Sequence, residues 1–262
     1  MAIESSVSVM TTLPRKHLGK LLALIFLGLA LLYFGAQSPV FKALVQWSPA
    51  LAAGFARNIL ISLVAIALGS LLGLLVGALA LSPLRLTRLP AQIWVQVFRN
   101  APWLVLIYFT TYVFPFEIHV AGVYLPFPDW VKVTIGLALP ASANIAEIFR
   151  GAVASIPATQ WEAARSLAFT RGQIFRSIIL PQCFKRMLPP WMNLYAVITM
   201  GTALASLVGV HDVIDTAQIA SNTVNMTGFT VVIYLSLLVL FFAYCYPISR
   251  LTRRLERRYA FY

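Results

Sequence analysis

The chain has 262 residues, of which 60% are hydrophobic and only 11% are charged. A soluble domain carries roughly one-quarter charged residues, so this composition excludes a soluble globular protein and indicates an integral membrane protein. The net charge of +12 comes from 20 Lys and Arg residues against 8 Asp and Glu residues. In such a chain a basic excess usually serves membrane topology, so we expect lipid as a partner and no nucleic acid.

Six stretches come near the roughly 20 apolar residues that are needed to cross about 30 Å of hydrocarbon. They are residues 18–36, 57–81, 90–114, 130–151, 189–210 and 228–249. Arg99, Asn100 and Pro102 interrupt the third stretch, where we expect a broken helix, and polar residues mark the fifth, so a count of five spans stays open. The region 15–39 also fits a signal peptide, but we favour an uncleaved first helix.

The distribution of basic residues predicts the orientation of the chain. Lys and Arg accumulate in short cytoplasmic loops, and here most of them precede the first stretch, follow the second, lie between the fourth and fifth, or close the chain. We therefore expect a multi-pass protein of the bacterial inner membrane with both termini in the cytoplasm. Cys183 and Cys245 would lie on this reducing side, where no disulfide is expected. Asp212 and Asp215 fall in a predicted outer loop.

The predicted cytoplasmic loop between the fourth and fifth stretches is basic and amphipathic. "TQWE" (159–162) and "TRGQ" (170–173) both have the form of a capping box, so each predicts the start of a short helix, with a bend between the two. The first helix carries a stripe of small or apolar residues, and the second carries a larger apolar face. These are Ala163, Ala164, Leu167 and Ala168 on the first helix, and Ile174, Phe175, Ile178 and Ile179 on the second.

This loop resembles that of the permease subunits of bacterial ATP-binding-cassette (ABC) importers, in the polar amino-acid and opine branch. Their loop has the pattern E-A-A-x3-G-x9-I-x-L-P, and Ala168 stands where the family usually has Gly. The positions that match are Glu162, Ala163, Ala164, Ile178, Leu180 and Pro181. The resemblance continues through "FRNAP" (98–102), "IAEIFRGAVASIPATQWEAAR" (145–165), "LPPWMN" (188–193) and "SLVGV" (206–210), and covers roughly residues 55–258.

The resemblance implies an all-α polytopic membrane bundle of about six helices, a five-helix core plus an N-terminal helix, as in type I ABC importers. It divides the chain into residues 1–54 (cytoplasmic tail, first helix and outer loop), the core 55–250 with its coupling loop 157–187, and a basic tail 251–262. In the family, the first loop helix docks into an ATPase subunit, so the coupling residues here would be Glu162, Ala163, Ala164, Leu167 and Ala168. For the alanines, packing against the chain's own helices is the alternative.

The function implied is import of a polar amino acid or an opine-like derivative that a periplasmic solute-binding protein delivers. The chain lacks the G-x4-G-K-[ST] motif of ATP-binding loops. ATP and Mg would therefore be used by a partner ATPase subunit, with no cofactor bound directly by this chain, which is not itself an enzyme. Met200 and Gly201 replace residues that are often polar in the family, which favours a second, non-identical permease and a heterodimer over a homodimer.

Several polar residues fall within the apolar stretches. Arg99 would lie near the bilayer midplane, where a charge needs a partner or water, and Glu147 and Arg150 are spaced to form an ion pair. Gly69, Gly73 and Gly77 would let a neighbouring helix approach closely, in this chain or in a partner. We expect the translocation path to be bordered by Asn100, Asn144, Thr202 and Ser206, although hydroxyl groups bonded to their own helix explain the last two equally well.

Other functions remain open alternatives. A secondary transporter or channel driven by an ion gradient usually shows internal repeats and buried carboxylates; no repeat is visible, and Glu147 is the one acid within a predicted span. A membrane-anchored scaffold would use the loop for interaction alone. A membrane enzyme is disfavoured because the sequence has no metal-ligand spacing and no G-x-S-x-G nucleophile motif.

Overall fold

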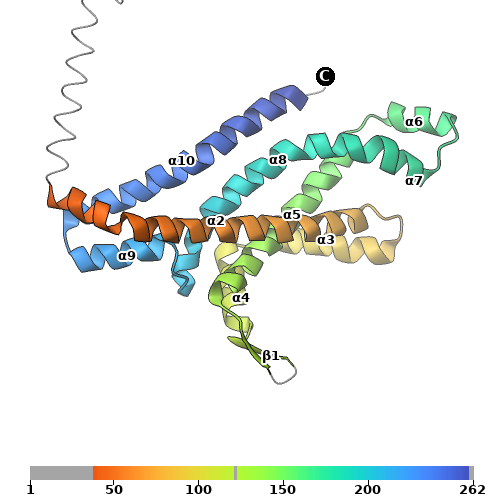
Figure 1. Cartoon of the computed structure of the whole chain (residues 1–262). Helices are drawn as coiled ribbons and strands as arrows, with labels where there is room; N and C mark the ends of the chain where they lie inside the picture. The colour runs from red at the N-terminus through yellow and green to blue at the C-terminus, as the bar shows by residue number, and fades with distance from the viewer. Residues whose placement is uncertain (1–37, 121–122, 260–262) are drawn as a thin grey trace, which may run out of the picture.

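The computed structural model describes residues 38–120 and 123–259. Within them the chain forms long helices and one short β-hairpin (Figure 1). The elements are α2 (Pro39–Ala80), α3 (Arg85–Asn100), α4 (Trp103–Val113), β1 (Glu117–Val120), β2 (Val123–Pro126), α5 (Asp129–Ala154), α6 (Ala158–Ser166), α7 (Arg171–Ile174), a π-helical turn (Phe175–Ile179), α8 (Leu180–Gly201), a 3₁₀ segment η2 (Thr202–Val208), α9 (Val213–Val224) and α10 (Thr227–Tyr259). The predicted span 18–36 lies outside the described residues, so the choice between five and six spans stays a prediction.

Helix α2 begins well before the predicted start at residue 57. The Ser38 hydroxyl accepts a hydrogen bond from the Phe41 N–H at 3.1 Å, and Pro39 occupies the first helical position, where its missing N–H costs nothing. The helix continues through Pro49 to Ala80. Residues 39–54, predicted to belong to an outer loop, are therefore helical, and the predicted boundary at 54/55 falls inside α2.

The third predicted span is broken, as expected. Helix α3 ends at Asn100, Ala101 and Pro102 are extended, and α4 starts at Trp103. Proline has no N–H to donate and disfavours helical geometry in the residue before it, which explains the break.

The connection from α4 to α5 forms the antiparallel pair β1–β2, in which Glu117 lies opposite Pro126. This hairpin is an addition to the predicted all-α fold.

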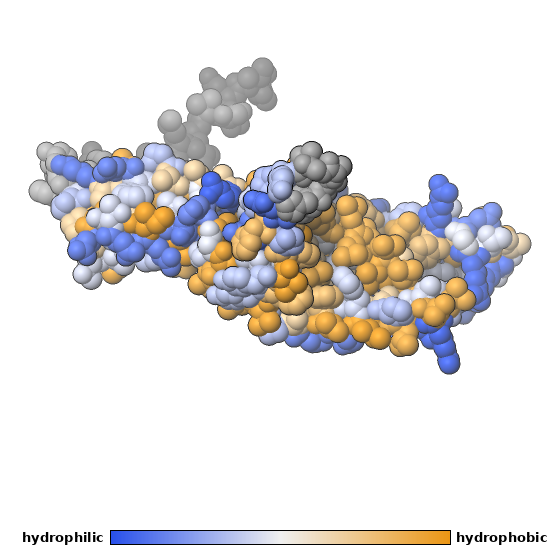
Figure 2. All heavy atoms as spheres, turned by 90° about the horizontal axis from the view of Figure 1, so that it is seen from below, coloured by the Kyte–Doolittle hydropathy of each residue, from blue (hydrophilic) through white to orange (hydrophobic). Residues whose placement is uncertain are grey.

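The described residues contain four helical stretches long and apolar enough to cross a membrane. They are Pro39–Ala80, Asp129–Ala154, Arg171–Val208 and Thr227–Tyr259. Helix α4 is apolar but shorter. Figure 2 shows hydrophobic side chains gathered over the middle of one face and hydrophilic side chains toward the two ends, which is the distribution expected for a membrane-spanning body.

The glycine series on α2 packs against α5. A Cβ atom at Gly69 would lie 2.6 Å from the Cβ of Ala141, and one at Gly73 would lie 2.5 Å from the Ser142 carbonyl oxygen. These distances are below van der Waals contact, so only glycine permits this approach. The predicted close packing is confirmed, and the neighbouring helix belongs to the same chain.

Candidate functional site

The connection between α5 and α8 folds into an elbow of two short helices, residues 158–179. Helix α6 and helix α7 are joined by residues 167–170, and α7 runs through the π-helical turn into α8. The elbow lies at the end of the molecule where α2 turns into α3 (Figure 1). The first short helix and the bend are therefore confirmed, whereas the second predicted helix does not end within the loop but continues without a break into α8.

A small apolar cluster ties the elbow to the two long helices it connects. Ala164 of α6 is buried and packs with residues from the end of α5, from α7 and from the start of α8, namely Ala152, Ile156, Ile174, Ile179 and Cys183. The Phe169 N–H also donates to the Ala164 carbonyl oxygen at 3.2 Å and closes the bend. One close-packed cluster therefore joins α6 to α5 and α8.

The outer surface of the elbow is exposed and partly apolar. Leu167 is 73% exposed and Phe169 is 43% exposed. Glu162, Ala163 and Ala168 are also exposed. Four of the five predicted coupling residues are thus accessible on the elbow.

Two predictions for the elbow are wrong in detail. Ala164 does not belong to the exposed stripe, because it is buried in the chain's own cluster. "TQWE" is not a capping box: α6 starts at Ala158 with Pro157 as its N-cap residue, and no side chain caps it, so Thr159 lies inside the helix. The "TRGQ" capping box is confirmed, with the Thr170 N–H donating to the Gln173 side-chain oxygen at 2.9 Å.

The four predicted path residues do not form one cluster. Asn100 is exposed and donates to the Gln96 carbonyl oxygen at 2.7 Å, and Asn144 is half-buried and donates to the Pro140 carbonyl oxygen at 2.8 Å. Ser206 donates to its own helix at Ala203, and Thr202 is fully buried. Among the hydrogen bonds of the described residues, none joins two of these four side chains.

The predicted ion pair on α5 is present and has a third member. The Arg150 Nη2 atom lies 2.7 Å from the Glu147 Oε2 atom, which confirms the pair. The Arg99 Nη1 atom lies 3.7 Å from the same oxygen, so Glu147 is the partner that Arg99 was expected to need. We call Arg99, Glu147 and Arg150 the charged trio.

A buried polar junction joins α2 to the segment between η2 and α9. The Asn58 Nδ2 atom donates to Asp212 Oδ2 at 3.0 Å and to Thr202 Oγ1 at 3.1 Å, and the Asn58 Oδ1 atom accepts from the Val213 N–H at 3.0 Å. Burial raises the pKa of the Asp212 carboxyl above its usual range. Asp212 lies in the connection between η2 and α9, where it is buried and serves as the N-cap residue of α9.

Sequence reasoning missed Asn58. The one available signal was an amide side chain within an apolar run. Replacing Asn58 by alanine would leave the Asp212 carboxylate and the Val213 N–H without these partners, so we expect the free energy of unfolding to fall by about 2–3 kcal/mol. Thermal unfolding of the purified protein in detergent measures this loss. The control Asn222→Ala changes an exposed residue on α9 and should stay within about 0.5 kcal/mol; an equal loss in both variants would contradict the role of the junction.

Comparison with known protein families assigns this chain to a family of membrane transport proteins. The family model described as the binding-protein-dependent transport system inner membrane component matches residues 65–261. The chain belongs to this family. The permease is 30% identical over 221 residues to the probable amino-acid ABC transporter permease protein YckA of Bacillus subtilis, covering 84% of this chain and 94% of that protein. It is also 30% identical to the octopine transport system permease protein OccM of Rhizobium radiobacter, covering 79% and 84%.

A solved structure agrees with this assignment. The crystal structure of an amino acid ABC transporter with histidines contains a chain that superposes on this permease with a TM-score of 0.74 at 26% identity, covering 83% of this chain and 98% of that one. Family, relatives and fold therefore identify the protein as a permease subunit of an ABC importer, a non-catalytic component of transport.

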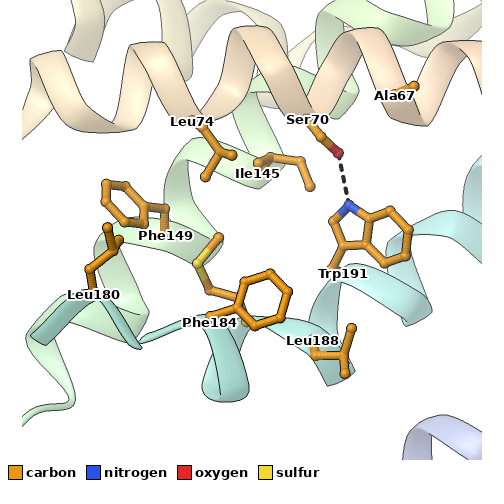
Figure 3. Close-up of a pocket in the computed structure, with 10 residues that line it drawn as sticks. Ala67, Ser70, Leu74, Ile145, Phe149, Leu180, Phe184, Leu188 and Trp191 are labelled. Atoms are coloured by element: carbon orange, nitrogen blue, oxygen red, sulfur yellow. Dashed lines mark hydrogen bonds between the residues drawn. The ribbon is translucent and has the colours of Figure 1, made fainter. Parts of the chain in front are cut away.

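The permease also has an apolar cavity of about 470 Å³ between α2, α5 and α8. In Figure 3, Leu74, Ile145 and Phe184 point into it, and the Trp191 indole N–H donates to the Ser70 hydroxyl at 2.8 Å. These two side chains bond to each other and the other lining side chains are apolar, so the walls offer little to a polar solute. This cavity is therefore not a site for a charged or strongly polar substrate.

The bend of the elbow holds a residue in a strained conformation. Ala168 has φ = 58°, in the left-handed region that glycine adopts freely and alanine does not. We expect Ala168→Gly to raise the free energy of unfolding of the permease by about 0.5–1 kcal/mol, because relief of strain exceeds the added entropy of the unfolded chain. The control Ala163→Gly, inside α6, should lower it by about 1 kcal/mol. Thermal unfolding checks both, and a loss of stability in Ala168→Gly would contradict this account of the bend.

Proposed function

We propose that this permease imports a polar amino acid or an opine-like derivative, powered by a separate ATPase subunit that binds the elbow. The observation that carries the coupling role is the elbow itself: Leu167 and Phe169 are exposed on its outer surface, while Ala164 is locked into a cluster with α5 and α8. A subunit that gripped the outer surface would move the ends of two membrane helices at once. Glu162, Ala163 and Ala168 would line the same contact, and Ala164 would transmit the displacement.

The solute class is supported by what the relatives transport. The names of two similar permeases state amino acids and octopine, and the similar solved transporter was crystallised with histidines. These compounds share an α-amino-acid group. A periplasmic binding protein would deliver the solute, the bacterial inner membrane would hold the complex, and both termini would face the cytoplasm, in line with the distribution of Lys and Arg.

The wider assembly follows the same proposal. ATP and Mg would be bound and used by the ATPase subunits, and a second permease would complete the path; Met200 and Gly201 favour a non-identical partner. Residues 55–250 would form the transport core with its coupling loop 157–187. Asn100, Asn144 and Ser206 remain proposed path residues, whereas Thr202 would act from its buried position by fixing η2 to Asn58.

Purification from the native membrane tests this function. We expect a complex of two permeases and two ATPase subunits, with ATP hydrolysis that rises when the binding protein and its solute are added. Mass spectrometry of the small molecules that the complex retains would identify the solute. A permease that purifies alone and transports in proteoliposomes without ATP would contradict the proposal and favour a transporter driven by an ion gradient.

A further inference from the structure

Helix α10 presents an exposed apolar surface on the side that faces away from the bundle. Its residues recur every three or four positions, so they lie on one side of the helix. They are Leu235, Val239, Phe242 and Tyr246, each between 42% and 62% exposed. The buried residues of α10, among them Leu237 and Thr252, lie on the other side, and α10 runs along one edge of the described helices (Figure 1).

Three arginines continue this surface at the C-terminal end of α10. Arg250, Arg253 and Arg257 follow Tyr246 at steps of four, three and four residues, so they lie on the same side of the helix, and all three are exposed. The ion pairs of the described residues involve none of them. We call the four apolar residues and the three arginines the α10 stripe, which changes from apolar to cationic along one helix.

Membrane topology alone does not account for the α10 stripe. Lys and Arg orient a chain by their number near the end of a span, whichever side of the helix they occupy. At this end of α10 the basic residues are all arginines, since Arg254 and Arg258 accompany the three in the stripe. Arginine, unlike lysine, offers two parallel N–H donors that match a phosphate group. Both the placement and the residue type therefore favour phosphate as the ligand.

We propose that the α10 stripe binds an anionic phospholipid, with the acyl chains along its apolar part and the phosphate at its arginines. Tyr246 suits this depth, because tyrosine is enriched where hydrocarbon meets the headgroups. Its ring stacks with that of Phe242, with centroids 5.0 Å apart. Arg250 lies about 6 Å farther along the helix, within reach of the headgroup layer. In the orientation proposed above, this end of α10 lies in the cytoplasmic leaflet.

Charge complementarity favours lipid over a second copy of this chain. The chain has 8 acidic residues against 20 basic ones, so a second copy would bring mainly further positive charge to the stripe. An anionic phospholipid supplies negative charge at the depth of the arginines and hydrocarbon at the depth of the apolar residues. One molecule thus satisfies both parts of the α10 stripe.

Two double variants separate a lipid site from diffuse positive charge. Arg250→Gln/Arg253→Gln removes the two cations nearest to Tyr246 and should weaken retention of phosphatidylglycerol at least about tenfold. The matched control Arg254→Gln/Arg258→Gln removes the same charge from the same end of α10, but from a side about a quarter of a turn away. It should stay within about twofold of the parent. Each variant keeps three of the five arginines that orient this end of the chain.

The measurement is native mass spectrometry of the full-length permease, released from detergent that contains equal amounts of phosphatidylglycerol and phosphatidylcholine with identical acyl chains. We expect the parent and the control to retain phosphatidylglycerol in preference, and Arg250→Gln/Arg253→Gln to lose this preference. Thermal unfolding of the same samples should be equal, because the substituted residues are exposed. Equal retention of the two lipids by the parent, or equal losses in the two double variants, would overturn the proposal.

A crosslinking experiment in native membranes identifies what covers the stripe in the assembled transporter. Phe242→benzoylphenylalanine places a photoreactive group in the apolar part of the stripe, where the parent residue is 62% exposed. We expect illumination to give a phospholipid adduct. An adduct to a second permease or to an ATPase subunit would show that protein covers the stripe and would overturn the lipid site. Neither readout requires transport, so the result is independent of the proposed solute.

Discussion

A Gly73→Val permease is expected to lose about 3 kcal/mol of its free energy of unfolding, which is the upper end of the usual range for overpacked cores. A Cβ atom at this position would lie 2.5 Å from the Ser142 carbonyl oxygen and 2.6 Å from the Ile145 Cβ atom. One obstacle is backbone and the other is the root of a branched side chain, so neither can rotate away. Helix α2 would have to separate from α5, the two helices that form the centre of the bundle. Thermal unfolding in detergent and the yield of membrane-inserted protein measure the effect.

The matched control is Gly151→Ala on α5. A Cβ atom there would meet nothing within 4 Å, so alanine should stabilise the helix by about 0.5–1 kcal/mol. The two glycines therefore predict opposite signs for the addition of a side chain. Equal stability of Gly73→Val and the parent permease would show that α2 and α5 do not pack at this distance.

The glycine series shows both the reach and the limit of the sequence. Spacing of four residues places Gly69, Gly73 and Gly77 on one helix face, which predicts a close helix contact from α2 alone. It contains no information on which helix makes that contact. Helix α5 makes this contact: its Ala141 faces Gly69, and the Ser142 carbonyl oxygen and the Ile145 side chain face Gly73. This match becomes visible only when the two helices are placed together.

Of the two capping-box patterns, "TRGQ" forms the capping box and "TQWE" does not, and the backbone before each pattern explains the difference. "TRGQ" is preceded by the strained bend at Ala168, which leaves Thr170 extended and free to cap. "TQWE" follows Pro157, whose extended backbone starts α6 at once and places Thr159 within the first turn. The pattern of residue types is the same, and the position of a proline decides the outcome.

The path residues were the least predictable part. A stripe of hydroxyl groups on one helix is compatible with a translocation path or with hydrogen bonds inside the protein. The Thr202 hydroxyl forms an internal bond, because Asn58, 144 positions away in the chain, donates to it. More of the charged trio could be predicted, since Glu147 and Arg150 are three residues apart on one helix and this spacing indicates an ion pair. The approach of Arg99 depends on the break after Asn100, which places the end of α3 beside α5.

A Leu167→Glu permease is expected to lose at least about tenfold in ATP-driven uptake while it folds as the parent does. Leu167 is 73% exposed in the parent, so a carboxylate there stays hydrated and costs little stability. In the proposed complex the same carboxylate would be desolvated against an ATPase subunit, and burial of an unpaired charge opposes binding strongly. Uptake in proteoliposomes, ATPase stimulation by the binding protein, and thermal unfolding are measured on one preparation.

Two further variants identify the cause of the loss. Leu86→Glu changes a leucine of α3 that is 88% exposed outside the elbow, and it should transport as the parent does. Ala164→Trp overfills the buried cluster that joins the elbow to α5 and α8, so it should lower stability by about 1–3 kcal/mol together with uptake. Loss of uptake without loss of stability is thus specific to the outer surface of the elbow. If Leu167→Glu retains full uptake and full ATPase stimulation, the exposed surface around Leu167 does not receive the driving subunit.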